Sequence, residues 1–195
     1  GSADVEQASR AFRAGNLDEA LKWPLKAAER GNVEGQFEVG LVYSMKKDSA
    51  RAREWLAKAA AQNHEKAMYS LGYDYFYSNQ GIPDEEDCRK AMDIFGRMAD
   101  QDMTFGYLGL GIAHLANNGC VEKDDGKAMD YLQRVYEREN KDALANAGFM
   151  IWTYQPEGVE DVEGKGMEFL QKAVDLGVRY TQCQIGFVYR DGRFN

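Results

Sequence analysis

The stretch REWLAKAAAQN at residues 53–63 is almost repeated as MEFLQKAVDLG at residues 167–177. Around the first copy, apolar residues recur at intervals of three and four, at Ala52, Trp55, Leu56, Ala59 and Ala60. This spacing predicts one apolar face of an α-helix, with Arg53, Glu54 and Lys58 on the solvent-exposed face. A helical phrase that occurs twice in one chain indicates an internal repeat.

Two different phrases recur along the whole chain. Phrase B, the helical phrase above, has the copies ALKWPLKAA (20–28), AREWLAKAA (52–60), AMDIFGRMA (91–99), AMDYLQRVY (128–136) and GMEFLQKAV (166–174). Phrase A has a central glycine and the copies FEVGLVY (37–43), YSLGYDY (69–75), LGLGIAH (108–114), ANAGFMI (145–151) and CQIGFVY (183–189).

The spacing of the two phrases shows that they belong to one repeating unit. The glycines of phrase A are separated by 32, 39, 37 and 38 residues, and the first residues of phrase B by the same four steps. Length changes therefore fall between the phrases, as expected when each repeat is a pair of helices joined by a variable loop. We call the two predicted helices helix A and helix B.

The glycines and prolines predict details of these helices. A glycine inside helix A costs about 1 kcal/mol relative to alanine, so its recurrence predicts that a neighbouring helix approaches closely there. Gly31 and Gly177 follow copies of phrase B and are predicted to end those helices. Pro24 lies within the first phrase B and is expected to kink or shorten that helix.

The phrases resemble the Sel-one-like repeat family, a relative of the tetratricopeptide repeats. AMYSLGYDY (67–75) followed by RKAMDIFGRMA (89–99), and TQCQIGFVYRDG (181–192), fit its pattern, and the likeness extends from about residue 3 to residue 192. The departures are the short first turn AGNLDEA (14–20), Gln36 near the usual small position, His114 and Ile151 in the tyrosine slot, and Gly166 in the alanine slot.

This resemblance implies an all-α fold, a right-handed superhelix of about five stacked helix-turn-helix repeats. Residues 3–195 are then expected to form a single repeat domain, and Gly1-Ser2 to be a cloning scar. The family architecture places the A helices on the concave side and the B helices on the convex side.

Composition narrows the classes of partner. The chain has 195 residues, a net charge of −8 and a pI near 4.9, so nucleic acids and anionic membrane surfaces are disfavoured and a basic protein partner is favoured. No apolar run reaches the roughly 20 residues of a membrane-spanning helix, so we expect no membrane insertion.

The helix A residues that face away from the Leu-Gly-Tyr side form the candidate partner-binding groove. They are Phe37, Leu41, Tyr69, Tyr73, Phe76, Leu108, Ile112, Phe149, Trp152 and Phe187. Either the superhelix packs these side chains against one another, or the face receives a partner, with Tyr73, Phe76 and Trp152 as the strongest anchors. We favour binding.

Acidic loops between helices A and B supply a second candidate feature. Asp84, Glu85, Glu86, Asp87, Glu160 and Asp161 are either solvated loop residues or an acidic rim that steers a basic partner toward the groove. They lack the spacing of a calcium-binding loop.

Nothing in the sequence nominates catalytic chemistry, a metal site or a cofactor. His64 and His114 are the only histidines, and both are interpreted as structural. The three cysteines, Cys88, Cys120 and Cys183, show no C-x-x-C spacing, so a zinc site is disfavoured. Cys88 and Cys120 lie in comparable segments of consecutive repeats, and a disulfide between them would indicate an oxidising compartment.

The predicted function is therefore non-catalytic protein binding. Among bacterial members, the resemblance points to a periplasmic immunity protein that neutralises a secreted antibacterial toxin, such as a type VI secretion phospholipase. The alternatives are an envelope or signalling adaptor, a cytoplasmic location and, less favoured, a hydrolase.

Overall fold

The computed structural model describes residues 10–11, 14–77 and 83–178, and all regular secondary structure in these ranges is α-helical. The predicted all-α class is therefore confirmed. The helices are α2 (Leu17–Glu29), α3 (Val33–Met45), α4 (Ser49–Ala60), α5 (Glu65–Tyr77), α6 (Glu85–Asp100), α7 (Thr104–Ala116), α8 (Asp125–Glu137), α9 (Lys141–Tyr154) and α10 (Val162–Asp175). Phrase B lies on α2, α4, α6, α8 and α10, and phrase A on the intervening helices. The last phrase A, around Gly186, falls outside the described ranges.

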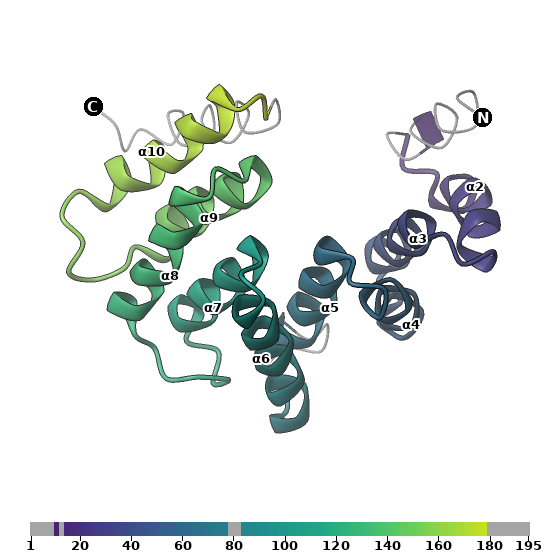
Figure 1. The fold of residues 1–195 in the computed structure, drawn as a ribbon, viewed down its shortest axis with the longest axis horizontal. Coiled ribbons are helices and arrows are strands. Elements are labelled where there is room, and N and C mark those ends of the chain that lie inside the picture. The colour runs from purple at the N-terminus through teal and green to yellow at the C-terminus, as the bar shows by residue number, and fades with distance from the viewer. Residues whose placement is uncertain (1–9, 12–13, 78–82, 179–195) are drawn as a thin grey trace. The chain divides into compact units, whose positions relative to one another are not determined.

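The chain forms two compact units, Gly1–Ile94 and Phe95–Asn195, whose boundary falls within α6. In the first unit α2 packs on α3, α3 on α4 and α4 on α5. In the second unit α7 packs on α8, α9 on both α7 and α8, and α10 on α9. Within each unit, successive A and B helices thus form the stacked helical hairpins that the two phrases predict (Figure 1).

Every helix B is followed by one residue in the left-handed backbone conformation. Gly31 and Gly177 occupy it with φ of 86° and 93°, which confirms their predicted role as helix terminators. The same repeat position holds three residues for which positive φ is less favourable: Asn63, Asp102 and Glu139, with φ of 59°, 58° and 55°.

Short polar side chains begin most of the helices. The side-chain oxygens of Asn32 and Asn140 accept the backbone N–H of Gly35 and Ala143 at the starts of α3 and α9. Such caps satisfy amide groups that have no partner within the helix. Equivalent caps on α2, α4, α8 and α10 come from Asn16, Asp48, Asp124 and Asp161.

The glycines of helix A allow helix B to approach closely, as predicted. An added Cβ on Gly40 would lie 2.7 Å from the Leu56 side chain, and one on Gly111 would lie 2.8 Å from that of Leu132. These leucines occupy the same position of α4 and α8, and both are fully buried. The glycine therefore makes room for the leucine that holds each hairpin together.

Pro24 does not shorten α2, which continues to Glu29. It is buried on the side that faces α3, where its carbonyl oxygen would lie 3.0 Å from an added Cβ on Gly35. Gly35, rather than Gln36, fills the small position at the start of α3. Of the two expected effects of Pro24, a kink or a shortened helix, the shortening does not occur.

Candidate interaction surface

Helix α5 carries a row of three tyrosines, Tyr69, Tyr73 and Tyr77, which are spaced one turn apart and partly exposed. The ring centroids of Tyr69 and Tyr73 are 5.9 Å apart, and those of Tyr73 and Tyr77 are 4.4 Å apart. Burial, with a smaller contribution from Tyr73, raises the pKa of the Tyr69 phenol, so its hydroxyl end is enclosed although part of the residue is exposed. We call this row the tyrosine ladder.

A second aromatic pair lies on α9, in the other compact unit. The centroids of Phe149 and Trp152 are 6.2 Å apart, and both side chains are partly exposed. The Trp152 backbone lies close to α10: an added Cβ on Gly166 would be 3.4 Å from the Trp152 backbone nitrogen. Both residues were predicted for the groove, and both remain accessible.

Other predicted groove residues lie in the core. Phe76 and Leu108 have 0% relative exposure and Ile112 has 1%, so these three side chains cannot meet a partner in this structure. The prediction that they line an open surface was wrong. The physical reason is clearest for α7, which is apolar all round and buried on several sides, as its residues Phe105 and Leu115 also show.

The remaining predicted residues differ in accessibility. Phe37 is nearly buried, at 9% relative exposure, and its ring packs against His64 with centroids 4.7 Å apart. Leu41 is partly exposed. Phe187 lies outside the described residues.

Most of the predicted acidic rim has local structural partners. Asp84 accepts the backbone N–H of Asp87 at 2.7 Å, and Asp161 accepts that of Gly164 at 3.0 Å, so both act as helix caps. Glu86 pairs with Lys90 at 2.6 Å. Glu85 and Glu160 are exposed.

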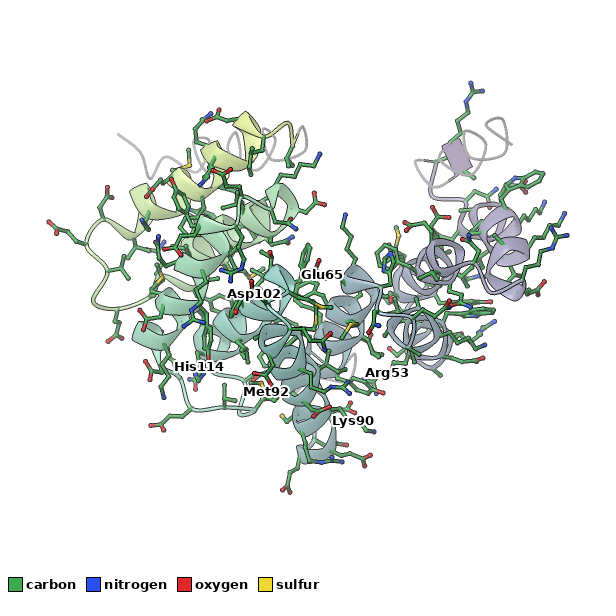
Figure 2. The ribbon with its side chains drawn as sticks, viewed as in Figure 1. Arg53, Glu65, Lys90, Met92, Asp102 and His114 are labelled. Atoms are coloured by element: carbon green, nitrogen blue, oxygen red, sulfur yellow. The ribbon has the colours of Figure 1, made fainter. Side chains whose placement is uncertain are left out.

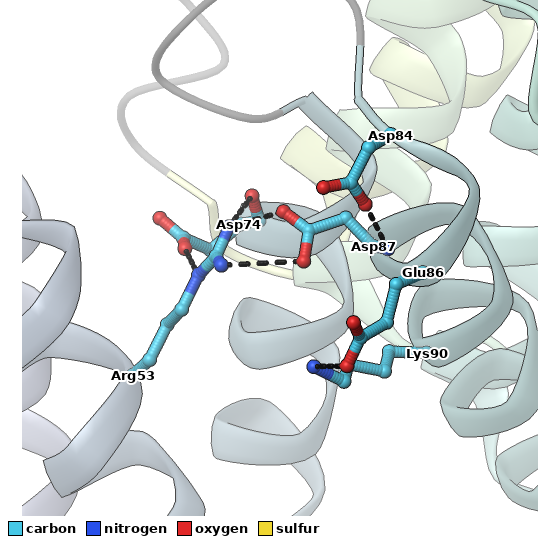
Figure 3. A network of polar contacts seen from close by, with 6 residues as sticks. All are labelled: Arg53, Asp74, Asp84, Glu86, Asp87 and Lys90. Carbon is cyan, nitrogen blue, oxygen red and sulfur yellow. Dashed lines mark hydrogen bonds and ion pairs between the residues drawn. The ribbon is translucent and has the colours of Figure 1, made fainter.

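Asp87 belongs to a network that joins α4, α5 and the part of α6 that lies in the first unit (Figure 3). Arg53 of α4 donates from Nε to the carboxylate of Asp74 on α5 at 2.6 Å, and from a terminal nitrogen to Asp87 on α6 at 3.0 Å. Its guanidinium also lies over the Tyr75 ring, 4.2 Å from the centroid. Arg53 was predicted to face solvent, but only 25% of its side chain is exposed because the network encloses it.

Both histidines make structural contacts. His64 Nδ1 accepts the backbone N–H of Ala67 at the start of α5, and its Nε2 lies 3.1 Å from the Glu34 carboxylate. His114, labelled in Figure 2, lies with Nδ1 3.1 Å from the carbonyl oxygen of Glu122 and stacks on Tyr131. These contacts agree with the structural interpretation of both residues.

A comparison with protein families identifies the repeat. Five consecutive segments, residues 11–32, 33–64, 65–103, 105–140 and 141–178, each match the Sel1 repeat. The chain belongs to the Sel1 repeat family. Each of the last four segments contains one helix A followed by one helix B, so the repeat inferred from the spacing of the phrases is the Sel1 repeat. Sel1 repeat proteins are protein-interaction modules and are generally non-catalytic scaffolds.

Solved structures of Sel1 repeat proteins resemble this chain in fold. A putative Sel1 repeat protein from Klebsiella pneumoniae is 21% identical, with 88% of this chain and 82% of that chain covered and a TM-score of 0.64. A Sel1 repeat protein from Oxalobacter formigenes is 24% identical, with coverages of 89% and 68% and a TM-score of 0.58.

A third similar structure is considerably longer. It is a protective antigen present in uropathogenic Escherichia coli strains that displays an SLR fold, and it is 23% identical with a TM-score of 0.53. The match covers 87% of this chain but 39% of the antigen. A search of curated proteins found no match.

Three accessible residues of this Sel1 repeat chain were missed by the sequence analysis. Tyr77 continues the tyrosine ladder, and its spacing of four residues from Tyr73 is a helical signal that was available. Met45 is 49% exposed, and Glu38 is exposed on the same helix. Their helical positions were readable from the sequence, whereas their exposure depends on the neighbouring helices.

Within the ranges that the structure describes, no helix is long and apolar enough to cross a membrane. The same ranges contain no group of three or more His, Cys, Asp or Glu side chains placed to hold a metal ion.

Proposed function

We propose that this chain is a non-catalytic module that binds a partner protein through the accessible side of its A helices. The observation that carries the proposal is the tyrosine ladder of α5, where three partly exposed residues are placed so that each ring lies beside the next. Tyrosine provides a large, rigid contact area with a polar end, and it is enriched at the energetic centres of protein interfaces.

We further propose that the partner is a secreted antibacterial toxin, such as a type VI secretion phospholipase, which the chain neutralises as an immunity protein. The net charge of −8 supports a basic partner, because complementary charge accelerates association and excludes wrong partners. Neutralisation would occur by occlusion, with the A-helix face covering a basic, anion-binding active site.

The test is co-expression with a toxin encoded beside this chain's gene. We expect the wild-type chain to restore growth and to bind the purified toxin tightly. Tyr73→Ala and Trp152→Ala are each expected to weaken the complex about 30-fold, the size of an interface hot spot. Leu176→Ala is the matched control, since Leu176 is 40% exposed at the end of a helix B.

Calorimetry and thermal unfolding separate binding from folding. If both aromatic variants retain wild-type affinity and stability, the assignment of the binding surface is wrong. If the chain binds the toxin but does not restore growth, binding stands and neutralisation does not.

An adaptor is the second candidate, and one observation favours it. The tyrosine ladder and the Phe149–Trp152 pair belong to different compact units, and an adaptor would use two such surfaces for two partners. In that case Tyr73→Ala and Trp152→Ala would each abolish binding of a different protein. For an immunity protein, either change would weaken binding of the same single toxin.

We propose a periplasmic location. Cys88 and Cys120 are both disulfide-bonded, and disulfides persist mainly in oxidising compartments. The test is alkylation of the protein trapped from its native cells. Neither cysteine is expected to react before reduction and both after it, with the protein in the periplasmic fraction. Labelling of both without reductant would place the chain in the cytoplasm.

A further inference from the structure

One face of α3 combines acidic and apolar side chains that are accessible. Glu34, Glu38, Leu41 and Met45 are spaced by four, three and four residues, so they lie on the same side of the helix. Both glutamates are exposed, Leu41 is partly exposed and Met45 is 49% exposed. We call these four residues the α3 stripe.

The acidic end of the stripe is electrostatically unfavourable in the isolated chain. Glu34 and Glu38 are like charges one helical turn apart, an arrangement that destabilises helices. Glu34 lies 3.1 Å from His64, whereas Glu38 has no ion pair or hydrogen bond among the described residues. Partial desolvation, followed by the charge of Glu34, raises the pKa of the Glu38 carboxyl. A cation supplied from outside would relieve this repulsion.

His64 links the acidic end of the stripe to the helix that carries the tyrosine ladder, because its Nε2 lies 3.1 Å from the Glu34 carboxylate. The His64 ring packs on Phe37 of α3, and its Nδ1 caps the first turn of α5, the helix that carries the ladder. The faces of tyrosine rings also attract Lys and Arg side chains. The acidic pair and the ladder therefore each suit cationic groups of a partner.

We propose that the α3 stripe receives a cationic amphipathic helix of the partner protein. Lys or Arg residues one turn apart would pair with Glu34 and Glu38, and apolar residues further along the same face would cover Leu41 and Met45. The stripe spans about three helical turns, roughly 16 Å, which suits a helix that binds through anchors at intervals of three and four residues. This inference rests on the proposed function and specifies the chemistry of its partner.

The probe is a synthetic helical peptide of about four turns. On one face it carries two lysines one turn apart, followed by two leucines. A charge-reversed peptide with glutamates in place of lysines and a scrambled peptide of the same composition are the peptide controls. Fluorescence anisotropy measures binding to the full chain.

The protein variants are Glu34→Gln/Glu38→Gln and Leu41→Ser/Met45→Ser. The matched control is Glu29→Gln/Glu137→Gln, which removes the same charge from two exposed glutamates on other helices. Each stripe variant is expected to bind the lysine peptide at least about fivefold more weakly than wild type, and the control to bind it as wild type does. The charge-reversed and scrambled peptides are expected to bind weakly to every protein.

Three results would overturn the inference: a scrambled peptide that binds as well as the designed one, equal losses in the stripe and control variants, or no binding of the lysine peptide to wild type. The toxin complex separates this failure from that of the proposed function. If Tyr73→Ala disrupts that complex and the stripe variants do not, the proposed function stands and the inference about α3 fails.

Discussion

The backbones of α9 and α10 meet at Gly148 and Gly166. A Cβ added to Gly148 would lie 2.8 Å from the carbonyl oxygen of Gly166, and one added to Gly166 would lie 3.1 Å from that of Gly148. Other B helices have alanine at the position of Gly166, as at Ala52 and Ala128. The glycine in the last described repeat therefore reflects a closer approach of the two helices.

Gly148→Ala is expected to destabilise the chain by about 1–3 kcal/mol, because the nearest atom belongs to the backbone and cannot rotate away. Gly166→Ala should cost less, since its distances are longer. Gly96→Ala is the control, because Gly96 lies within α6 and an added Cβ meets nothing within 4 Å. Alanine should stabilise that helix by up to about 1 kcal/mol. Urea unfolding measures all three, and equal effects at Gly148 and Gly96 would refute the close contact.

Gly109→Ala is expected to destabilise the second unit, because an added Cβ would overlap the Phe95 ring. Other B helices have Leu56, Leu132 or Leu170 at the position of Phe95. Phe95→Leu should therefore reduce the cost of Gly109→Ala, and the coupling in a double-mutant cycle should be about 1 kcal/mol or more. Additive effects would show that the two residues do not constrain each other.

The residue after each helix B offers a test of backbone conformation. Gly31→Ala is expected to cost about 1 kcal/mol, since an added Cβ meets no atom within 4 Å and only the positive φ opposes it. Asn63→Gly should stabilise the chain, because glycine adopts a positive φ without steric cost. The gain should be only a few tenths of a kcal/mol, because asparagine tolerates this conformation better than most residues. Chemical denaturation would contradict this if both changes had the same sign.

Arg53→Met should destabilise the first unit by about 2–4 kcal/mol, because it leaves the largely buried Asp74 and Asp87 without their cation. Arg53→Lys should recover part of this loss, since lysine keeps the charge but not the forked geometry. Lys58→Met is the control and should change stability by less than about 1 kcal/mol, because the Lys58–Glu54 pair is exposed. A loss of equal size in Arg53→Met and Lys58→Met would exclude a structural role for the network.

Glu38→Gln is expected to stabilise the chain at neutral pH by a few tenths of a kcal/mol. The folded state raises the pKa of Glu38, so its charged form destabilises the fold at pH values above that pKa. The penalty disappears as pH falls below the ordinary carboxyl pKa of about 4.3, where the group is protonated in both states. The stability difference from wild type, measured by denaturant unfolding, should therefore vanish near pH 3. A difference that persists there would point to a packing effect.

The repeat architecture was predictable because it follows from local sequence patterns. The apolar spacing of phrase B, the glycine of phrase A and their common steps depend on helical geometry alone, and Gly31 and Gly177 marked two helix ends by backbone preference. Asn63 is a weaker signal of the same kind, whereas Glu139 adopts the same positive φ without any such preference in its residue type.

The interaction surface was only partly predictable. Tyr69, Tyr73, Phe149 and Trp152 remain accessible as expected, whereas Phe76, Leu108 and Ile112 are enclosed although they occupy the same predicted face. Similarly, the apolar spacing predicted a solvent-exposed Arg53, but the carboxylates of Asp74 and Asp87 on two other helices enclose its side chain.

By itself the sequence determined the helices, their pairing into Sel1 repeats and the acidic charge of the chain, since each depends on residue type and spacing. Which aromatic side chains stay accessible, and which acidic residues cap helices or pair with cations, was decided by the tertiary structure. The physical reason is that exposure and pairing depend on neighbours brought together from distant parts of the chain.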